Sequence, residues 1–245
     1  MPTNIGVPAQ PVSDSSTGQI LDALRAAVSN EVVIVDLESG RAWWETRLLV
    51  LVAGAKRHGR PLGIVFLATV GGAPGCFQGW GRPGDLLPAL LDANPKYRLC
   101  YARANAAAAQ WALVEPSGAP VPPPVQPWMS GLATQHPWVA FEPGSGLPNP
   151  FAFEQFFANE LGNQVEMAAG GAWVSAARLK ELFVPVLYEE RIDDDWPEDQ
   201  KVAGFLKAAG RYVAITRGGT YQRLLGKDAG MAALVQSLSK AAPAA

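Results

Sequence analysis

Hydrophobic positions in the first third of the chain predict a strand, a helix and a second strand in succession. Residues 31–36 (EVVIVD) form a β-branched run that is apolar on both faces, which is typical of a strand buried in a parallel sheet. Apolar residues then recur at helical spacing between residues 48 and 55, with Thr46 as a candidate cap, and Gly59 ends the helix. Residues 62–70 are again continuously apolar. We therefore expect a βαβ unit with a right-handed crossover.

The rest of the chain predicts helices, short strands and one hairpin. Residues 71–84 are rich in glycine and predict a loop, within which residues 76–80 could form a short strand. Two short apolar runs flank Arg217-Gly218-Gly219 and predict a β-hairpin over residues 212–225. Residues 138–141 are a further candidate strand. Helices are predicted over residues 19–28, 85–92, 96–113, 151–161, 176–183, 195–209 (with Asp195 as the cap of a capping box) and 229–239.

Two segments without apolar periodicity divide the chain. Residues 1–17 combine Pro, Ser, Thr and Gly, which predicts a disordered arm. Residues 115–128 contain six prolines and favour an extended connector, the alternative being a recognition segment for an aromatic groove on another protein. We therefore expect an α/β fold of two lobes. An N-terminal lobe (residues 18–114) contains the βαβ unit and a short, mainly parallel sheet, and a smaller α+β lobe follows (residues 129–245).

Composition narrows the class of protein without naming an activity. The chain has 245 residues, 49% hydrophobic and 17% charged, which is enough apolar material for a sizeable core. Its net charge of −2 gives no general attraction to nucleic acid or anionic lipid, and its longest apolar run is too short to span a membrane. The first residues lack the pattern of a signal peptide. We expect a cytoplasmic protein that binds neither nucleic acid nor membrane, and the abundance of Ala, Gly and Pro is typical of bacterial coding bias.

Cysteine and histidine are too scarce to indicate a metal site or a common hydrolase. Cys76 and Cys100 cannot build a disulfide framework, and with His58 and His136 they do not form a zinc-ligand pattern, so we expect no metal and no cofactor. Catalytic pairing of His136 with Ser145 or Cys100 has no support in their spacing. An enzyme whose carboxylates lie far apart in the sequence stays open as an alternative.

Two motifs resemble ligand sites only superficially. Residues 79–84 spell G-x-G-x-x-G, but the dinucleotide fingerprint needs its glycines directly between a strand and a helix, and a surface loop is favoured here. Residues 189–199 are strongly acidic, but a calcium loop starting at Asp193 would have Glu198 where glycine is needed and Gly204 where a carboxylate is needed. This segment indicates a solvated loop, with weak divalent binding or a basic partner as alternatives.

One region of the predicted fold gathers polar and aromatic side chains. Ligands of open parallel sheets bind beyond the carboxyl ends of the strands. The predicted first strand ends at Asp36 and is followed by Arg41 and Trp44, and the glycine-rich loop follows the second strand. If both strands are parallel, these segments converge, unless Trp43 and Trp44 simply belong to the core. The candidate ligand-binding residues are Asp36, Arg41, Trp44, Gly79, Gly81 and Arg82.

The leading functional hypothesis is a non-catalytic binding or regulatory protein that acts through contacts with a protein partner. The chain has eight tryptophans, a residue enriched at interface anchors, and no local cluster of acid, base and nucleophile. The alternative is a sensor of a small molecule or nucleotide bound at the strand-end crevice. The sequence does not predict an oligomeric state.

Overall fold

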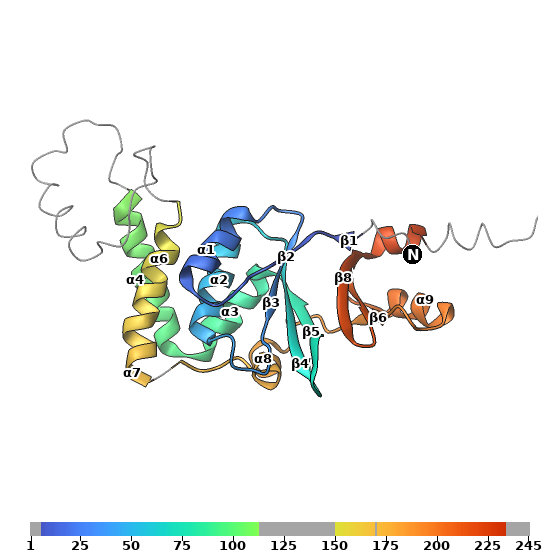
Figure 1. Ribbon diagram of the computed structural model, residues 1–245. Helices are drawn as coiled ribbons and strands as arrows, with labels where there is room; N and C mark the ends of the chain where they lie inside the picture. The colour runs from blue at the N-terminus through green and yellow to red at the C-terminus, as the bar shows by residue number, and fades with distance from the viewer. Residues whose placement is uncertain (1–5, 113–149, 170, 234–245) are drawn as a thin grey trace, which may run out of the picture.

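The computed structural model describes residues 6–112, 150–169 and 171–233, and the strands of this part form one mixed eight-stranded sheet (Figure 1). The order across the sheet is β2-β3-β4-β5-β8-β7-β6, with β1 also paired to β8. The strands are β1 (Gly6–Val7), β2 (Ala9–Pro11), β3 (Val32–Asp36), β4 (Gly63–Val70), β5 (Ala73–Gly81), β6 (Arg191–Asp193), β7 (Tyr212–Arg217) and β8 (Thr220–Gly226).

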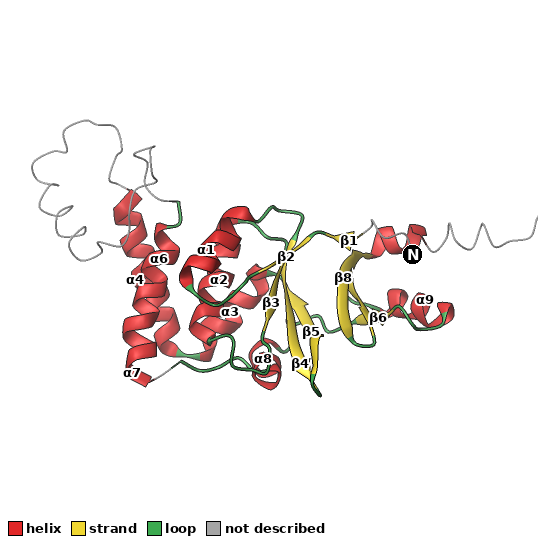
Figure 2. Cartoon of the chain, in the orientation of Figure 1, coloured by secondary structure: helices red, strands yellow, loops and turns green. Residues whose placement is uncertain are grey.

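Helices cover one side of the β2–β5 half of the sheet, and α9 lies beside β6 in the other half (Figure 2). The outermost helices of the first group, α4 and α6, lie side by side. The helices are α1 (Thr17–Ala26), α2 (Glu45–His58), α3 (Pro83–Ala93), α4 (Pro95–Ala112), α6 (Ala152–Leu161), the π-helix η1 (Gly162–Glu166), α7 (Met167–Ala169), α8 (Ala176–Phe183) and α9 (Glu198–Lys207).

The βαβ unit predicted from the apolar pattern is present. β3 and β4 pair in parallel and α2 connects them. α2 ends where predicted, since Gly59 has a φ of 65° and its N–H donates to the carbonyls of Ala55 and Lys56. The predicted cap was wrong: α2 begins after Trp44, and Thr46 lies buried inside the first turn. Its hydroxyl group donates to Glu166, a partner that local sequence cannot reveal.

Alternating side chains along the strands divide the interior into three apolar clusters. Alternate residues of β3 and β4 face the helices, and the residues between them face the β7–β8 hairpin. Both faces of these strands are therefore buried, which explains their continuous apolar runs. The first cluster includes Val33, Val35, Ile64 and Phe66; the second includes Val32, Val65, Trp80 and Leu224; the third lies under α9 and includes Phe205, Val213, Ile215 and Leu225.

Segments from both sides of the predicted connector contribute to the same sheet and to the same helical layer. α6 and α8 pack into the first cluster; for example, Phe183 of α8 stacks on Phe66 of β4 with ring centroids 5.8 Å apart. Residues 115–128 themselves lie outside the described residues, as do Ser145, His136 and the candidate strand at 138–141. The α/β class is confirmed, whereas the division into two lobes stays a prediction.

The prediction of a disordered arm over residues 1–17 was wrong for its described part. β1 pairs antiparallel with β8, and β2 pairs parallel with β3. Backbone hydrogen bonds hold this segment, including one from Val32 N–H to the Pro8 carbonyl and one from Val12 N–H to the Ile34 carbonyl. Strands of two and three residues are too short to show an apolar period, so no local pattern predicts them.

The candidate strand at residues 76–80 is present but longer: most of the predicted glycine-rich loop over residues 71–84 is strand β5, antiparallel to β4. Only Gly71 and Gly72 form the turn, with φ values of 59° and 85°. Gly79 and Gly81 both lie in this strand. Larger residues would collide with neighbouring side chains there, because an added Cβ would lie 2.6 Å from Leu187 at Gly79 and 2.6 Å from Leu86 at Gly81. The sheet is therefore mixed rather than mainly parallel.

The C-terminal hairpin is confirmed, and the capping box is not. β7 and β8 pair antiparallel around Gly218 and Gly219, whose φ values are 56° and 81°. α9 begins at Glu198 after Pro197, which makes no side-chain cap. The backbone N–H of Asp195 donates to the Asp193 carboxylate instead, at 3.1 Å.

Candidate functional site

The predicted strand-end residues are spread along the sheet. Asp36 pairs with Leu67 near the end of β4, and its carboxylate accepts the backbone N–H of Glu38. Gly81 pairs with Ile64 near the start of β4, because β5 runs antiparallel. Three residues of strand separate these levels, roughly 10 Å. The exposed Arg82 follows Gly81, Gly79 pairs with Phe66 between the two levels, and the exposed Arg41 follows β3. The structure does not bring Asp36 and Arg82 to one edge.

The two tryptophans after β3 have different environments. Trp43 is 2% exposed and belongs to the main core, as the alternative interpretation predicted. Trp44 packs edge-to-face on Trp173, with ring centroids 5.4 Å apart. Residues 43–45 also bridge to residues 172–174 through backbone hydrogen bonds from Glu45 N–H to the Ala172 carbonyl and from Val174 N–H to the Trp43 carbonyl. Residues 172–174, which are far from α2 in the sequence, therefore hold the start of α2 in place.

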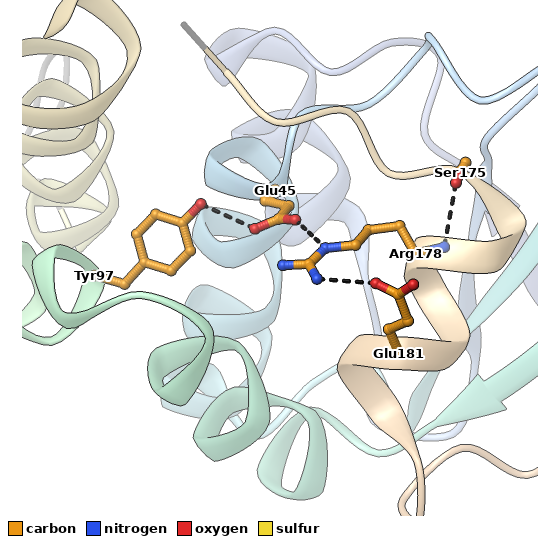
Figure 3. A network of polar contacts seen from close by, with 5 residues as sticks. All are labelled: Glu45, Tyr97, Ser175, Arg178 and Glu181. Carbon is orange, nitrogen blue, oxygen red and sulfur yellow. Dashed lines mark hydrogen bonds and ion pairs between the residues drawn. The ribbon is translucent and has the colours of Figure 1, made fainter. Parts of the chain in front are cut away.

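The first residue of α2 anchors a polar network that runs from the buried Glu45 to the exposed Glu181, shown in Figure 3. Glu45 is 2% exposed; its Oε1 accepts Arg178 Nε at 2.6 Å and its Oε2 accepts the Tyr97 hydroxyl group at 3.1 Å. Arg178 also binds Glu181 at 3.1 Å. Burial, with the charge of Glu45, raises the pKa of Tyr97, and the hydrogen bond to Glu45 raises the pKa of Arg178. The network therefore holds α2, α4 and α8 together with a neutral tyrosine and a charged arginine.

The next two residues of α2 contact a second carboxylate, Glu166 in the π-helix η1. Its Oε1 accepts the Thr46 hydroxyl group at 2.6 Å and its Oε2 accepts Arg47 Nη2 at 2.7 Å. Arg47 Nη1 donates to Thr17 Oγ1, also at 2.6 Å. The Glu166 side chain is only 9% exposed and that of Arg47 is 22% exposed. π-Helical turns are rare and frequently mark functional sites, so this ion pair is the best starting point for a site.

An open pocket of about 480 Å³ lies beside this ion pair. We call it the Arg47 pocket. α1, α2, α6 and η1 all contribute to its wall, and its volume lies within the range of about 300–1,000 Å³ that is usual for small-molecule sites. The lining residues are Thr17, Gly18, Leu21, Arg47, Gln155, Ala158, Asn159, Gly162, Asn163, Glu166 and Met167.

None of the ligand-binding residues predicted from the sequence lines this pocket. The predicted Arg41 and Trp44 lie just before Arg47 in the chain. Glu166, however, is 119 positions from Arg47. No local motif marks such a pair, and the sequence Gly162-Asn-Gln-Val-Glu166 has no recognised π-helix signature.

Other chemistry-bearing residues serve the fold. His58, expected only to end α2, has its Nε2 atom 3.2 Å from Glu154 Oε1, and Glu154 is fully buried. Asp193 accepts the hydroxyl group of Thr216 and the backbone N–H of Gly219, which ties β6 to the β7–β8 turn. Burial would raise the pKa of Asp193, but these N–H donors outweigh it and the pKa is lowered.

Within residues 6–112, 150–169 and 171–233, no three His, Cys, Asp or Glu side chains are grouped so that they could hold a metal ion. No helix of the same part is both long and apolar enough to cross a membrane. The chain matches no protein-family model, no curated protein and no solved structure.

Proposed function

We propose that this chain is a non-catalytic binding protein that holds a small polar molecule in the Arg47 pocket. The observation that carries the proposal is the largely buried ion pair between Arg47 and Glu166 on the wall of a ligand-sized cavity. Buried ion pairs seldom favour folding over an apolar pair of the same volume, so their presence beside a cavity supports a binding role.

The polar groups of the pocket are held in place before a ligand arrives. Thr17 and Glu166 fix the guanidinium group of Arg47, and Thr46 fixes Glu166. A site whose side chains are already ordered loses less conformational entropy on binding. The two charged groups neutralise each other, which suits recognition better than proton transfer. We place the ligand here rather than at the strand-end crevice, because Asp36 and Arg82 do not share an edge.

The test is a thermal-shift screen of the full chain with a library of small polar metabolites, followed by calorimetry on each hit. Asn163→Leu narrows the pocket, and Gln164→Leu is the matched control: both side chains are exposed on η1, but Gln164 does not line the pocket. A ligand of the pocket should lose affinity with Asn163→Leu and keep it with Gln164→Leu. Equal effects of the two variants on every hit, or no hit at all, would contradict the proposal.

A contact with a protein partner is a second candidate function. Trp173 is 44% exposed although it packs against Trp44, so a large aromatic surface is held rigidly at the surface. Mass spectrometry of material purified from the native host should then show a partner that is lost with Trp173→Ser and kept with Trp196→Ser, a similarly exposed control at 38%. Equal recovery with both variants would count against Trp173 as an anchor. We also propose that the protein is cytoplasmic, that its role is regulatory and that its chain is organised in two lobes.

A further inference from the structure

We infer that the ligand of the Arg47 pocket is an α-amino acid with an uncharged, largely apolar side chain. The inference rests on the proposed function and adds the chemical class of the ligand. It follows from the charge of the pocket, from the hydrogen-bonding capacity left on the ion pair, and from the remaining wall.

The charged side chains that line the pocket are one cation, Arg47, and one anion, Glu166. Both are largely buried already, and a ligand that fills the cavity would remove more water from them. A ligand with a single charge would satisfy one of them and repel the other at close range. A ligand that carries one positive and one negative charge can compensate both.

Each partner of the ion pair has hydrogen-bonding capacity to spare. Arg47 has five N–H donors and uses two of them, toward Thr17 and Glu166. The Glu166 carboxylate has about four acceptor positions, and Thr46 and Arg47 occupy two. A ligand carboxylate can therefore bind Arg47 and a ligand ammonium group can bind Glu166 without breaking the existing pair.

The spacing of the pair limits how far apart the ligand charges can be. Arg47 Nη2 and Glu166 Oε2 are 2.7 Å apart, so the two ligand groups that they bind must also be neighbours. In an α-amino acid the carboxylate and the ammonium group are attached to the same carbon atom. In a γ-amino acid three carbons separate them, so the chain must fold back to bring both groups to the pair, which costs conformational entropy.

The rest of the wall indicates the side chain of the ligand. Asn159 and Asn163 add neutral hydrogen-bonding groups, and Leu21, Ala158 and Met167 add apolar surface. These residues offer no further charge to pair with a lysine-like or glutamate-like side chain, which would lose water without compensation. Leucine and methionine fit this chemistry.

The experiment is isothermal titration calorimetry of the full chain with L-leucine and L-methionine. Leucine is compared with two analogues that each lack one charged group: isopentylamine without the carboxylate, and 4-methylpentanoate without the ammonium group. We expect the two amino acids to bind and each analogue to bind at least about tenfold more weakly, since each loses a charge-assisted hydrogen bond. Asn163→Leu should weaken binding of the amino acids, whereas Gln164→Leu should not.

The outcomes separate the ligand class from the pocket itself. Binding of either single-charge analogue as tight as that of leucine would overturn the inference. The inference would also be overturned if neither amino acid bound while another compound, such as a polyol or a nucleoside, bound in a way that Asn163→Leu weakens. In that case the proposed function would still stand. If neither the amino acids nor any compound of the screen binds with that sensitivity, both the inference and the proposed function fail.

Discussion

Removing His58 should destabilise the protein strongly, because it leaves a carboxylate alone in the core. Glu154 is 0% exposed, and its Oε1 lies 3.2 Å from His58 Nε2. Neither carboxylate oxygen has a hydrogen-bond partner among the described residues. If His58 is protonated, the two side chains form a buried ion pair, and truncating one member of such a pair costs about 3–5 kcal/mol. His58→Ala also loses a ring contact with Phe151 at 4.5 Å, which contributes roughly 0.5–1.5 kcal/mol more.

Replacing the carboxylate should have a much smaller effect. Methionine is unbranched and similar in length, so Glu154→Met can occupy the narrow space beside Gly54, where an added Cβ would lie 3.0 Å from Glu154 Cγ. Replacing a buried charge with an apolar side chain of similar volume is often neutral or stabilising. We expect the double variant His58→Ala/Glu154→Met to be more stable than His58→Ala alone, because no unpaired charge is left.

The assay is urea denaturation at pH 7, with the free energy of unfolding from linear extrapolation. Asp22→Ala is the control, since it removes an exposed ion pair with Arg25 and should cost at most about 1 kcal/mol. A cost below about 1 kcal/mol for His58→Ala would refute the reasoning, because it would mean that Glu154 is not left as an unpaired buried charge. A double variant less stable than His58→Ala would refute it as well.

Three further predictions concern other described contacts. Tyr97→Phe should lower the free energy of unfolding by about 1.5–3 kcal/mol in urea, because Glu45 Oε2 loses its donor; no change would mean that water replaces the hydroxyl group. Asp193→Asn should lower the melting temperature at pH 7. Since folding lowers the pKa of Asp193, that stabilisation is present above its usual pKa of 3.8 and is lost below it, so the two melting curves should converge in acid; a constant difference would contradict this. Ellman's reagent should label the partly exposed Cys76 in the native protein and Cys100 only after unfolding, since burial, with the charge of Glu160, raises the pKa of the Cys100 thiol; two fast native thiols would contradict it.

Elements with a local signal were predictable from the sequence, and contacts between distant segments were not. The β3-α2-β4 unit and the β7–β8 hairpin have apolar runs that end at glycines, so their bounds could be inferred. Only the middle of β5, residues 76–80, is predicted as a possible strand, because the glycines around it favour a loop, whereas Gly79 is glycine because Leu187 covers it. Leu187 lies more than 100 positions after Gly79 in the chain, so the local sequence cannot reveal this contact.

The candidate site shows the same limit. Sequence reasoning identified the region after β3, where Arg41 and Trp44 lie, because strand ends are a general location for ligands. The pair that defines the pocket joins α2 to η1 and depends on how α6 packs against α2. Arg47 and Glu166 are unremarkable as isolated residues, so only the folded chain identifies them.

The position of β1 has a consequence for how the protein is made. Gly6 pairs with Leu225, so β1 is synthesised 219 positions before the strand residue that it pairs with. Until then β1 has no strand beside it, and unpaired strand edges are where foreign chains add to a sheet. A translation product that stops before residue 220 would lack β8 and would keep this edge open. Nascent or interrupted chains should therefore depend on chaperones more than the finished protein does.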